Sequence, residues 1–302
     1  MKNSTLTRLV LFSSLLLFPL LAHAETPPSI DGIKDVYGKA VVPAYLVAEY
    51  PSGKIISGKN IDVKNQIASL TKLITAYTVR QENLNLQNST PFRWKKFNTG
   101  RIPKKAFRFS EGEMVKNQDV LELMLVISNN SASRMLAAAT GLKEKDFIAK
   151  MNNNVAALGM DNTALFDTSG LNNKNVSTAR NLLTIFMVNL ADPQLASSLG
   201  RPIYTFKSKL GKRTVDHTIH SSNLIPSLYK KRDYDILASK TGFTGQLSTI
   251  AMLVKSKLDG KQYVVITLGN PNYAKRFLVP HQIAQWVSKD LGVASLASVG
   301  NN

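Results

Sequence analysis

Three short strings in the chain carry residue types that can perform acyl transfer together. They are Ser69-Leu70-Thr71-Lys72, Ser128-Asn129-Asn130 and Lys240-Thr241-Gly242. The first offers a hydroxyl nucleophile and an amine base, the second a further hydroxyl and an amide, and the third a cation beside a glycine. A serine hydroxyl attacks a carbonyl only when a neighbouring group removes its proton, and a lysine can remove it when its surroundings lower its pKa. Together the strings predict a site for nucleophilic acyl transfer.

The setting of Ser69 and Lys72 separates this pair from a second Ser-x-x-Lys at Ser227 to Lys230. Residues three apart on a helix lie on one face, with Cβ atoms about 5–6 Å apart. Ser227 instead follows a proline and precedes a charged, loop-like stretch. An ordinary helix start with a solvated lysine is the alternative for Ser69 and Lys72. Burial and a second cation, for which Lys240 is the candidate, would turn Lys72 into a base. Apolar residues recur at helical spacing after Ser69: Leu70, Leu73, Ile74 and Tyr77.

The second string falls between two helical patterns, at residues 119–127 and 131–139. This loop either points Ser128 and Asn130 into a cleft or caps the helix that follows, since serine and asparagine are common capping residues. A second Ser-x-Asn, at Ser221 to Asn223, shows that the string also arises by chance. Only its order relative to the other two strings favours the cleft.

The third string, Lys240 to Gly242, lies between strand-like stretches at residues 235–238 and 247–254. A glycine in a strand lets another backbone or a ligand approach closely. An edge strand with a lysine could bind an extended peptide by strand addition, with the peptide carboxylate facing the cation. A turn with a surface lysine is the other interpretation. The long gaps between the strings require distant elements to meet at one cleft.

In this order the strings resemble the serine DD-peptidases and β-lactamases, which share Ser-x-x-Lys, Ser-x-Asn and Lys-Thr-Gly. More narrowly, the chain is similar to the low-molecular-mass penicillin-binding proteins of the D-alanyl-D-alanine endopeptidase and carboxypeptidase type. The similarity covers roughly residues 44–286. One departure is Gln246-Leu247-Ser248, where relatives often have small residues. Further stretches carry the likeness: Leu158 to Thr163, Thr168 to Leu171, Asn175 to Arg180 and Lys240 to Thr244.

The resemblance implies a role for each matching residue. Ser69 would be the acylated nucleophile and Lys72 its base, while Ser128 and Asn130 would relay protons and hold the substrate amide. The backbone N–H groups of Ser69 and Phe243 would form the oxyanion hole that stabilises the transition state. The substrate-binding residues would follow one another on a single strand: Lys240, Thr241, Gly242, Phe243 and Thr244.

The element pattern and the resemblance predict an α+β fold of the β-lactamase/transpeptidase type. Its antiparallel sheet is flanked by helices, with an interleaved helical lobe. We expect a hairpin at residues 45–57, helices at 144–158 and 178–190, strands at 245–254 and 262–268, and a final helix at about 279–291. Residues 25–302 would form one catalytic domain with the site between a sheet lobe and a helical lobe.

Residues 1–24 have the pattern of a cleavable signal peptide. Lys2 and Arg8 precede an apolar run at residues 9–21, and Ala22-His23-Ala24 follows that run. No other stretch approaches the roughly 18 apolar residues of a membrane span. The chain has no cysteine, which excludes disulfides and a lipid-modified cysteine. We therefore expect a soluble periplasmic protein.

The net charge of +18, or +16 without the signal peptide, suits a polyanionic partner. Basic and aromatic residues alternate at residues 93–97 and 104–108, a mixture that can bind single-stranded nucleic acid. We expect no nucleic acid for an exported protein. Peptidoglycan or phospholipid surfaces are the available anions, and a solvated basic face is the alternative.

We expect a serine DD-peptidase that needs no cofactor, acts on peptidoglycan stem peptides and is acylated by β-lactams. His217 and His220 have a spacing sometimes used for metals, but a polar strand explains them as well, and we expect no metal site. Only 60 residues follow Gly242, and they are needed to finish the catalytic fold. Cleavage of D-Ala to diaminopimelate cross-links is therefore favoured over D-alanyl-D-alanine carboxypeptidase activity. A β-lactamase, which in class A needs a deacylating glutamate, and a non-catalytic murein-binding protein are the remaining alternatives.

Overall fold

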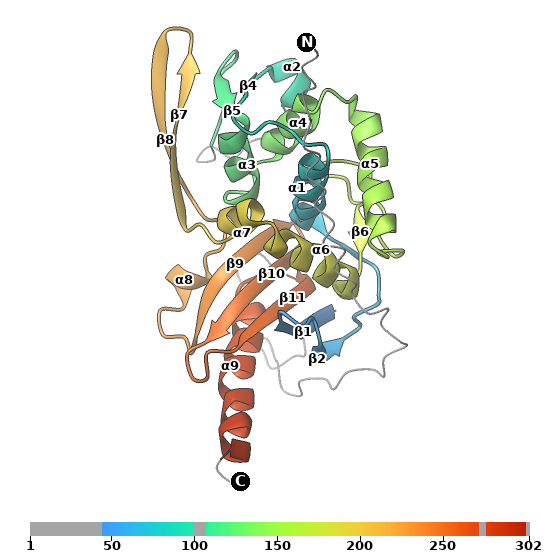
Figure 1. Ribbon diagram of the computed structural model, residues 1–302, viewed down its shortest axis with the longest axis vertical. Helices are drawn as coiled ribbons and strands as arrows, with labels where there is room; N and C mark the ends of the chain where they lie inside the picture. The colour runs from blue at the N-terminus through green and yellow to red at the C-terminus, as the bar shows by residue number, and fades with distance from the viewer. Residues whose placement is uncertain (1–43, 99–106, 272–275, 300–302) are drawn as a thin grey trace, which may run out of the picture.

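The computed structural model describes residues 44–98, 107–271 and 276–299 (Figure 1). The expected signal peptide, together with Lys104 and Lys105 of the second basic cluster, lies outside these residues. In Figure 1 a group of helices occupies one lobe and a sheet backed by the last helix occupies the other. From Ala44 onward the chain runs first through the sheet, then through the helices and back to the sheet, as the sequence pattern predicted.

The main sheet has five antiparallel strands in the order β2-β1-β11-β10-β9, so β9 lies at one edge. Side chains of a strand alternate between its two faces. On β1, Leu46 packs into a core shared with the helical lobe, whereas Val47 packs into a second core with the final helix, α9. Both faces of the sheet are therefore covered. The elements are β1 (Ala44–Tyr50), β2 (Ile55–Lys59), β9 (Tyr234–Phe243), β10 (Leu247–Ser256), β11 (Gln262–Pro271) and α9 (Leu278–Val299).

The helical lobe surrounds one central helix, α1 (Thr71–Gln81), which follows a single 3-10 turn, η1 (Ala68–Leu70). The sequence predicted one buried face for this helix, but its polar residues Thr75 and Thr78 are buried as well. Each has a partner on a neighbouring segment: Thr75 donates to the Thr168 carbonyl (2.7 Å), and Thr78 accepts from the Asn154 amide (3.0 Å). The helices that contact α1 are α3 (Asn117–Leu125), α4 (Asn130–Ala139), α5 (Glu144–Ala157) and α6 (Ala179–Ala191).

A second sheet, which the sequence did not predict, stands beside the helices in the order β4-β5-β7-β8. Its long hairpin projects from the molecule in Figure 1. On the inner face of the hairpin, Phe206 stacks on His217 at 4.6 Å, and Ser208 bonds both His217 and buried Glu113. His220 lies on the opposite face of β8, so the two histidines cannot share one ligand. The strands are β4 (Ser89–Pro91), β5 (Met114–Lys116), β7 (Ile203–Leu210) and β8 (Arg213–His220).

The predicted hairpin at residues 45–57 and the helices at 144–158 and 178–190 are confirmed. The final helix is longer than predicted, because residues 292–299 contain no proline and continue the helix to Val299. Taken alone, no helix in the described part of the chain is long and apolar enough to span a membrane, although α6 and the helix after it pass that test as a bent pair. The remaining short elements are β3 (Asn65–Gln66), α2 (Trp94–Phe97), β6 (Val176–Ser177), α7 (Pro193–Leu199) and α8 (Ile225–Leu228).

Candidate active site

Ser69 and Lys72 lie where the 3-10 turn η1 passes into α1, and their side chains meet. The Nζ atom of Lys72 is 2.8 Å from Ser69 Oγ, 2.7 Å from Asn130 Oδ1 and 2.6 Å from the carbonyl oxygen of Ser169. The amine is fully buried. The two side chains meet as the spacing predicted, but Ser69 lies in the 3-10 turn and only Lys72 lies in α1.

The surroundings of Lys72 suit a base. Burial lowers its pKa to about 7, and the nearby carboxylate of Asp167 opposes this effect. Near neutral pH a substantial share of the side chain is thus the free amine. Asn130 Oδ1 and the Ser169 carbonyl can only accept hydrogen bonds, so they take the two N–H bonds of that amine. Its lone pair is then left to accept the proton of Ser69.

The loop of Ser128 and Asn130 connects α3 to α4 and brings both side chains to the same place. Asn129 caps α4 by accepting a hydrogen bond from the N–H of Ala132 (2.9 Å). Ser128 has a left-handed backbone, with φ of 62°, which turns the chain before the helix. Both interpretations of this string therefore hold for different residues: Asn129 caps the helix, while Ser128 and Asn130 face the two lysines.

Lys240, on the edge strand β9, is the second buried lysine. Its Nζ donates to Ser128 Oγ and to the Thr241 carbonyl, both at 2.8 Å. Burial, then the positive charges of Lys72 and Arg276, hold the pKa of Lys240 well below its ordinary value. We expected Lys240 to act as the cation that lowers the pKa of Lys72. Burial is the main cause for both lysines, and the positive charge of Lys72 further lowers the pKa of Lys240.

Gly242 allows β9 to pass directly beside the nucleophile. A Cβ atom at this position would lie 2.4 Å from Thr249 Oγ1 and 3.0 Å from the backbone nitrogen of Ser69. Only glycine permits so close an approach. Phe243 ends the strand, and the hydroxyl of Thr244 bonds both backbone groups of Leu247 in the turn to β10. The predicted Lys-Thr-Gly string is thus part of a strand and not of a connection between strands.

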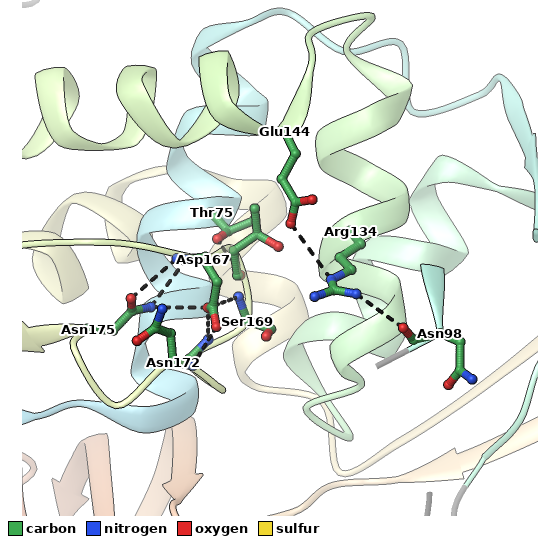
Figure 2. A network of polar contacts seen from close by, with 10 residues as sticks. Thr75, Asn98, Arg134, Glu144, Asp167, Ser169, Asn172 and Asn175 are labelled. Carbon is green, nitrogen blue, oxygen red and sulfur yellow. Dashed lines mark hydrogen bonds and ion pairs between the residues drawn. The ribbon is translucent and has the colours of Figure 1, made fainter. Parts of the chain in front are cut away.

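A loop at residues 167–175 contacts Lys72 through the carbonyl of Ser169, and the sequence did not predict this contact. Figure 2 shows the polar contacts that hold the loop. Asp167 Oδ1 accepts from the N–H groups of Ser169 (2.8 Å) and Gly170 (2.6 Å), and its Oδ2 accepts from that of Asn172 (2.5 Å). Asn175 ties the loop to α1 through Thr71 Oγ1 (3.0 Å). An aspartate followed closely by serine and glycine is typical of such turns, but nothing in the sequence pairs it with Lys72.

A cavity of about 280 Å³ adjoins the turn that carries Ser69, with Ala68 in its wall. Its polar side chains are carboxamides and one threonine, and its lining is Gln66, Ala68, Gly170, Leu171, Asn172, Asn173, Phe243, Thr244 and Gln246. Arg276, a further residue that the sequence did not single out, places its guanidinium 5.8 Å from the ring centre of Phe243. The buried lysines therefore give the site a cationic part, and the cavity gives it a neutral, amide-lined part.

The second copies of the strings do not make the contacts to Lys72 or Lys240 that the first copies make. Ser227 is exposed on α8 and bonds the Leu224 carbonyl (3.1 Å). Ser221 to Asn223 lies beside β9, where the amide of Asn223 donates to Ser239 Oγ (3.0 Å). The order of the strings along the chain therefore selected the copies that the fold brings together.

Comparisons with known proteins agree with the resemblance. The sequence profile of the family described as D-alanyl-D-alanine carboxypeptidase matches residues 38–272. A Pseudomonas aeruginosa D-alanyl-D-alanine endopeptidase is 30% identical over 251 residues, 82% of this chain and 76% of that protein. A Haemophilus influenzae protein of the same description is 27% identical and covers 78% of each chain. The solved D-alanyl-D-alanine carboxypeptidase of Mycobacterium tuberculosis has a TM-score of 0.72 at 23% identity, over 89% of this chain and 96% of that one. The predicted α+β fold of the β-lactamase/transpeptidase type is thereby confirmed.

Proposed function

The chain belongs to the D-alanyl-D-alanine carboxypeptidase family and is a serine DD-peptidase, and we propose that it hydrolyses D-Ala-containing peptide bonds of peptidoglycan through an acyl-enzyme on Ser69. One observation carries this proposal. The buried amine of Lys72, with a pKa of about 7, has two acceptor-only partners and one hydroxyl partner, which is Ser69. Such an arrangement directs the lone pair of a weak base at the nucleophile.

In the first half-reaction a net proton passes from Ser69 to the leaving amine, and an ester bond to Ser69 replaces the peptide bond. Ser69 Oγ attacks the carbonyl of a D-Ala residue while its proton passes to Lys72 Nζ. The backbone N–H groups of Ser69 and Phe243 face the oxyanion that forms. Lys240 donates to Ser128 Oγ, so the proton of Ser128 can pass to the departing amine. The proton that Lys72 gained then replaces it, which restores Ser128 and the free amine of Lys72. Water attacks the ester, Lys72 takes the proton of that water, and the proton returns to Ser69 Oγ as the ester bond breaks and the product acid leaves.

The cationic part of the site suits the carboxylate on the leaving-group side of the substrate. Burial and the neighbouring charges of Lys72 and Arg276 disfavour the ammonium form of Lys240. A bound anion offsets this penalty because an opposite charge nearby favours the charged form. Lys240, Thr241 and Arg276 would hold the carboxylate, and the amide-lined cavity would receive the stem peptide on the acyl side.

Asp167 argues against the β-lactamase alternative. Residues 165–170 contain no glutamate, and the carboxylate at this place accepts hydrogen bonds from three backbone N–H groups. A carboxylate engaged in that way holds a loop and is poorly placed to activate water for rapid deacylation. The meeting of nucleophile and base argues equally against a protein that only binds murein, because binding requires neither.

A labelling experiment tests the proposal. The purified protein is incubated with fluorescent penicillin, and the labelled peptide is identified by mass spectrometry. We expect a long-lived adduct on Ser69 that the Ser69→Ala variant lacks and that the Ser227→Ala control retains. Label on Ser227, or none at all, would overturn the assignment. Rapid release of penicilloic acid would place the protein with the β-lactamases.

We further propose that D-Ala to diaminopimelate cross-links are preferred over terminal D-Ala. The support is that the Pseudomonas aeruginosa and Haemophilus influenzae relatives are both described as D-alanyl-D-alanine endopeptidases. The D-alanyl-D-alanine carboxypeptidase activity that describes the family is the alternative. Cross-linked dimers and monomeric pentapeptide muropeptides are digested side by side with equal amounts of enzyme. Free D-alanine as the main product, with intact dimers, would contradict the preference and leave the serine mechanism unchanged.

The location is part of the same proposal. We infer that residues 1–24 are a signal peptide, that residues 25–302 form the catalytic domain, and that the domain acts in the periplasm, where peptidoglycan lies. The observation behind this inference is the charged, apolar and small-residue order of residues 1–24. N-terminal sequencing of the exported protein should begin at Glu25. A protein that keeps Met1 after fractionation would contradict it.

A further inference from the structure

The segment Ser221 to Asn223 joins β8 to α8 and touches three elements of the site at once. The N–H of Ser221 donates to the carbonyl of Pro202 at the base of the hairpin (2.8 Å). The N–H of Ser222 donates to the carbonyl of Val126 (2.9 Å), two residues before Ser128. Asn223 holds β9 through Ser239. Backbone and amide contacts therefore fix this segment between the two walls of the cleft.

The hydroxyl of Ser222 is not needed for that anchoring and makes a different contact. Ser222 Oγ lies 2.7 Å from Thr241 Oγ1, and Thr241 is almost fully buried on the substrate-binding strand. Thr241 and Ser239 are two apart on β9, so both face this segment, whereas Lys240 faces Ser128. Ser222 therefore contacts the hydroxyl of Thr241, which is the only hydroxyl in the Lys240-Thr241-Gly242 string.

We propose that Ser222 is a positioning residue that orients the hydroxyl proton of Thr241 toward the substrate carboxylate, an inference that rests on the proposed function of the site. A hydroxyl has one proton to donate and two lone pairs that accept. When Ser222 donates to Thr241 Oγ1, the proton of Thr241 must point elsewhere, and the carboxylate is the acceptor on the cleft side. Without Ser222 that proton is free to rotate away.

The test compares two β-lactams that differ in one group. Acylation rates of the full chain are measured with benzylpenicillin, which carries a carboxylate, and with its methyl ester, which does not. Ser222→Ala should slow acylation by benzylpenicillin about 2- to 10-fold, as expected for one hydrogen bond, and leave the methyl ester unaffected. Ser222→Thr keeps the hydroxyl and should restore the rate. Ser227→Ala, on the exposed face of α8, is the matched control.

A double-mutant cycle separates positioning from a structural role. In a Thr241→Val background the hydroxyl of Ser222 has nothing to orient, so Ser222→Ala should cause no further loss. Equal slowing of both β-lactams, an additive loss in the Thr241→Val background, or an unchanged benzylpenicillin rate would each overturn the inference. If unmodified protein is not acylated on Ser69 at all, the proposed function fails instead, and the two failures are distinguishable.

Discussion

At the scale of single residues, the chemistry depends on how the three hydrogen bonds of Lys72 are divided. Asn130 and the Ser169 carbonyl cannot donate, so the hydroxyl of Ser69 is the one partner that can give Lys72 a proton. By accepting one N–H bond of Lys72, Asn130 orients the amine so that its lone pair faces Ser69. Ser128 relates to Lys240 in a similar way, as an acceptor whose own proton stays available.

Replacing Lys72 with alanine should abolish acylation at every substrate concentration, because Ser69 then keeps its proton. The loss of a positioned base typically lowers the rate by about 10²–10⁴. The rate of fluorescent penicillin labelling measures it. Lys174→Ala, which removes an exposed lysine within the 167–175 loop, serves as control and should label normally. Labelling of Lys72→Ala at near the normal rate would show that another group takes the proton.

Asp167→Asn should shift the pH dependence of acylation to lower pH. Asp167 raises the pKa of Lys72 against the effect of burial, so its loss lowers that pKa below about 7. Acylation requires the free amine, and its rate rises as pH passes through the pKa of Lys72; this rise should therefore come earlier. Asp161→Asn, which alters an exposed carboxylate of the same lobe, should leave the profile unchanged. A shift to higher pH in Asp167→Asn would contradict the electrostatic argument.

The residues that the sequence identified are those that lie in short strings. Ser69, Lys72, Ser128, Asn130 and Lys240 could be found because each string places chemistry at a fixed spacing. Asp167, Ser222 and Arg276 could not, since each is joined to the site by a contact across 19 or more residues, and no spacing signals it. From the sequence, Lys72 could be assigned as a base only on the condition that it is buried. That burial is a property of the folded lobe, so the lowered pKa could not be predicted from the sequence alone.

At the scale of elements, the tightest fit lies between the 167–175 loop and the turn that carries Ser69. Gly170 has φ of +84°, and a Cβ atom there would lie 1.8 Å from the carbonyl oxygen of Ala68. The loop and η1 are therefore in direct backbone contact. Either the loop or the nucleophile must move if Gly170 gains a side chain.

Gly170→Ala should thus impair acylation and lower the melting temperature more than a matched substitution elsewhere. Gly159→Ala is that control, because Gly159 also has a positive φ, +69°, but no atom lies within 4 Å of its added Cβ. Both variants carry the cost of a left-handed alanine, about 1 kcal/mol, and only Gly170→Ala displaces Ser69. Thermal unfolding and penicillin labelling measure the two effects. Equal behaviour of the two variants would show that the loop yields without moving the nucleophile.

The elements differ in how far their sequences predicted them. Helices α3 to α6 were recognised within a few residues because their apolar positions follow a helical period. The β7–β8 hairpin was missed because its inner face mixes Phe206 with the polar residues Ser208 and His217. Those polar groups are satisfied by Glu113, which precedes β5 and lies 95 residues before Ser208. A buried polar cluster of distant residues leaves no periodic hydrophobic signal.

At the scale of the whole molecule, the cleft gathers residues from both lobes. The helical lobe supplies Ser69, Lys72, Ser128 and Asn130, and the sheet supplies Lys240 through its edge strand.

The aromatic residues of the basic clusters at residues 93–97 and 104–108 are less accessible in the structure than the sequence suggested. Phe97 and Phe109 are buried, Phe107 packs against Phe109, and Arg93 pairs with Glu111 at 3.5 Å. Aromatic rings placed in a core are poor stacking platforms for nucleic acid, whereas Trp94, Lys95 and Lys96 remain exposed.

The net charge of +16 that remains without residues 1–24 should make association with isolated sacculi salt-sensitive. Exposed charges separated by more than about 8 Å are largely screened at physiological ionic strength, so retention should fall steeply as salt rises above that level. The measurement uses Ser69→Ala, which binds without turning the substrate over, in a pelleting assay at increasing salt. Replacing Lys95 and Lys96 with glutamine should flatten the curve if the α2 surface contributes, and replacing the exposed Lys143 and Lys145 of the α5 region provides a charge-matched control. Retention that does not change with salt would mean that the cleft alone holds the polymer, and the basic surface would then be a solvated face.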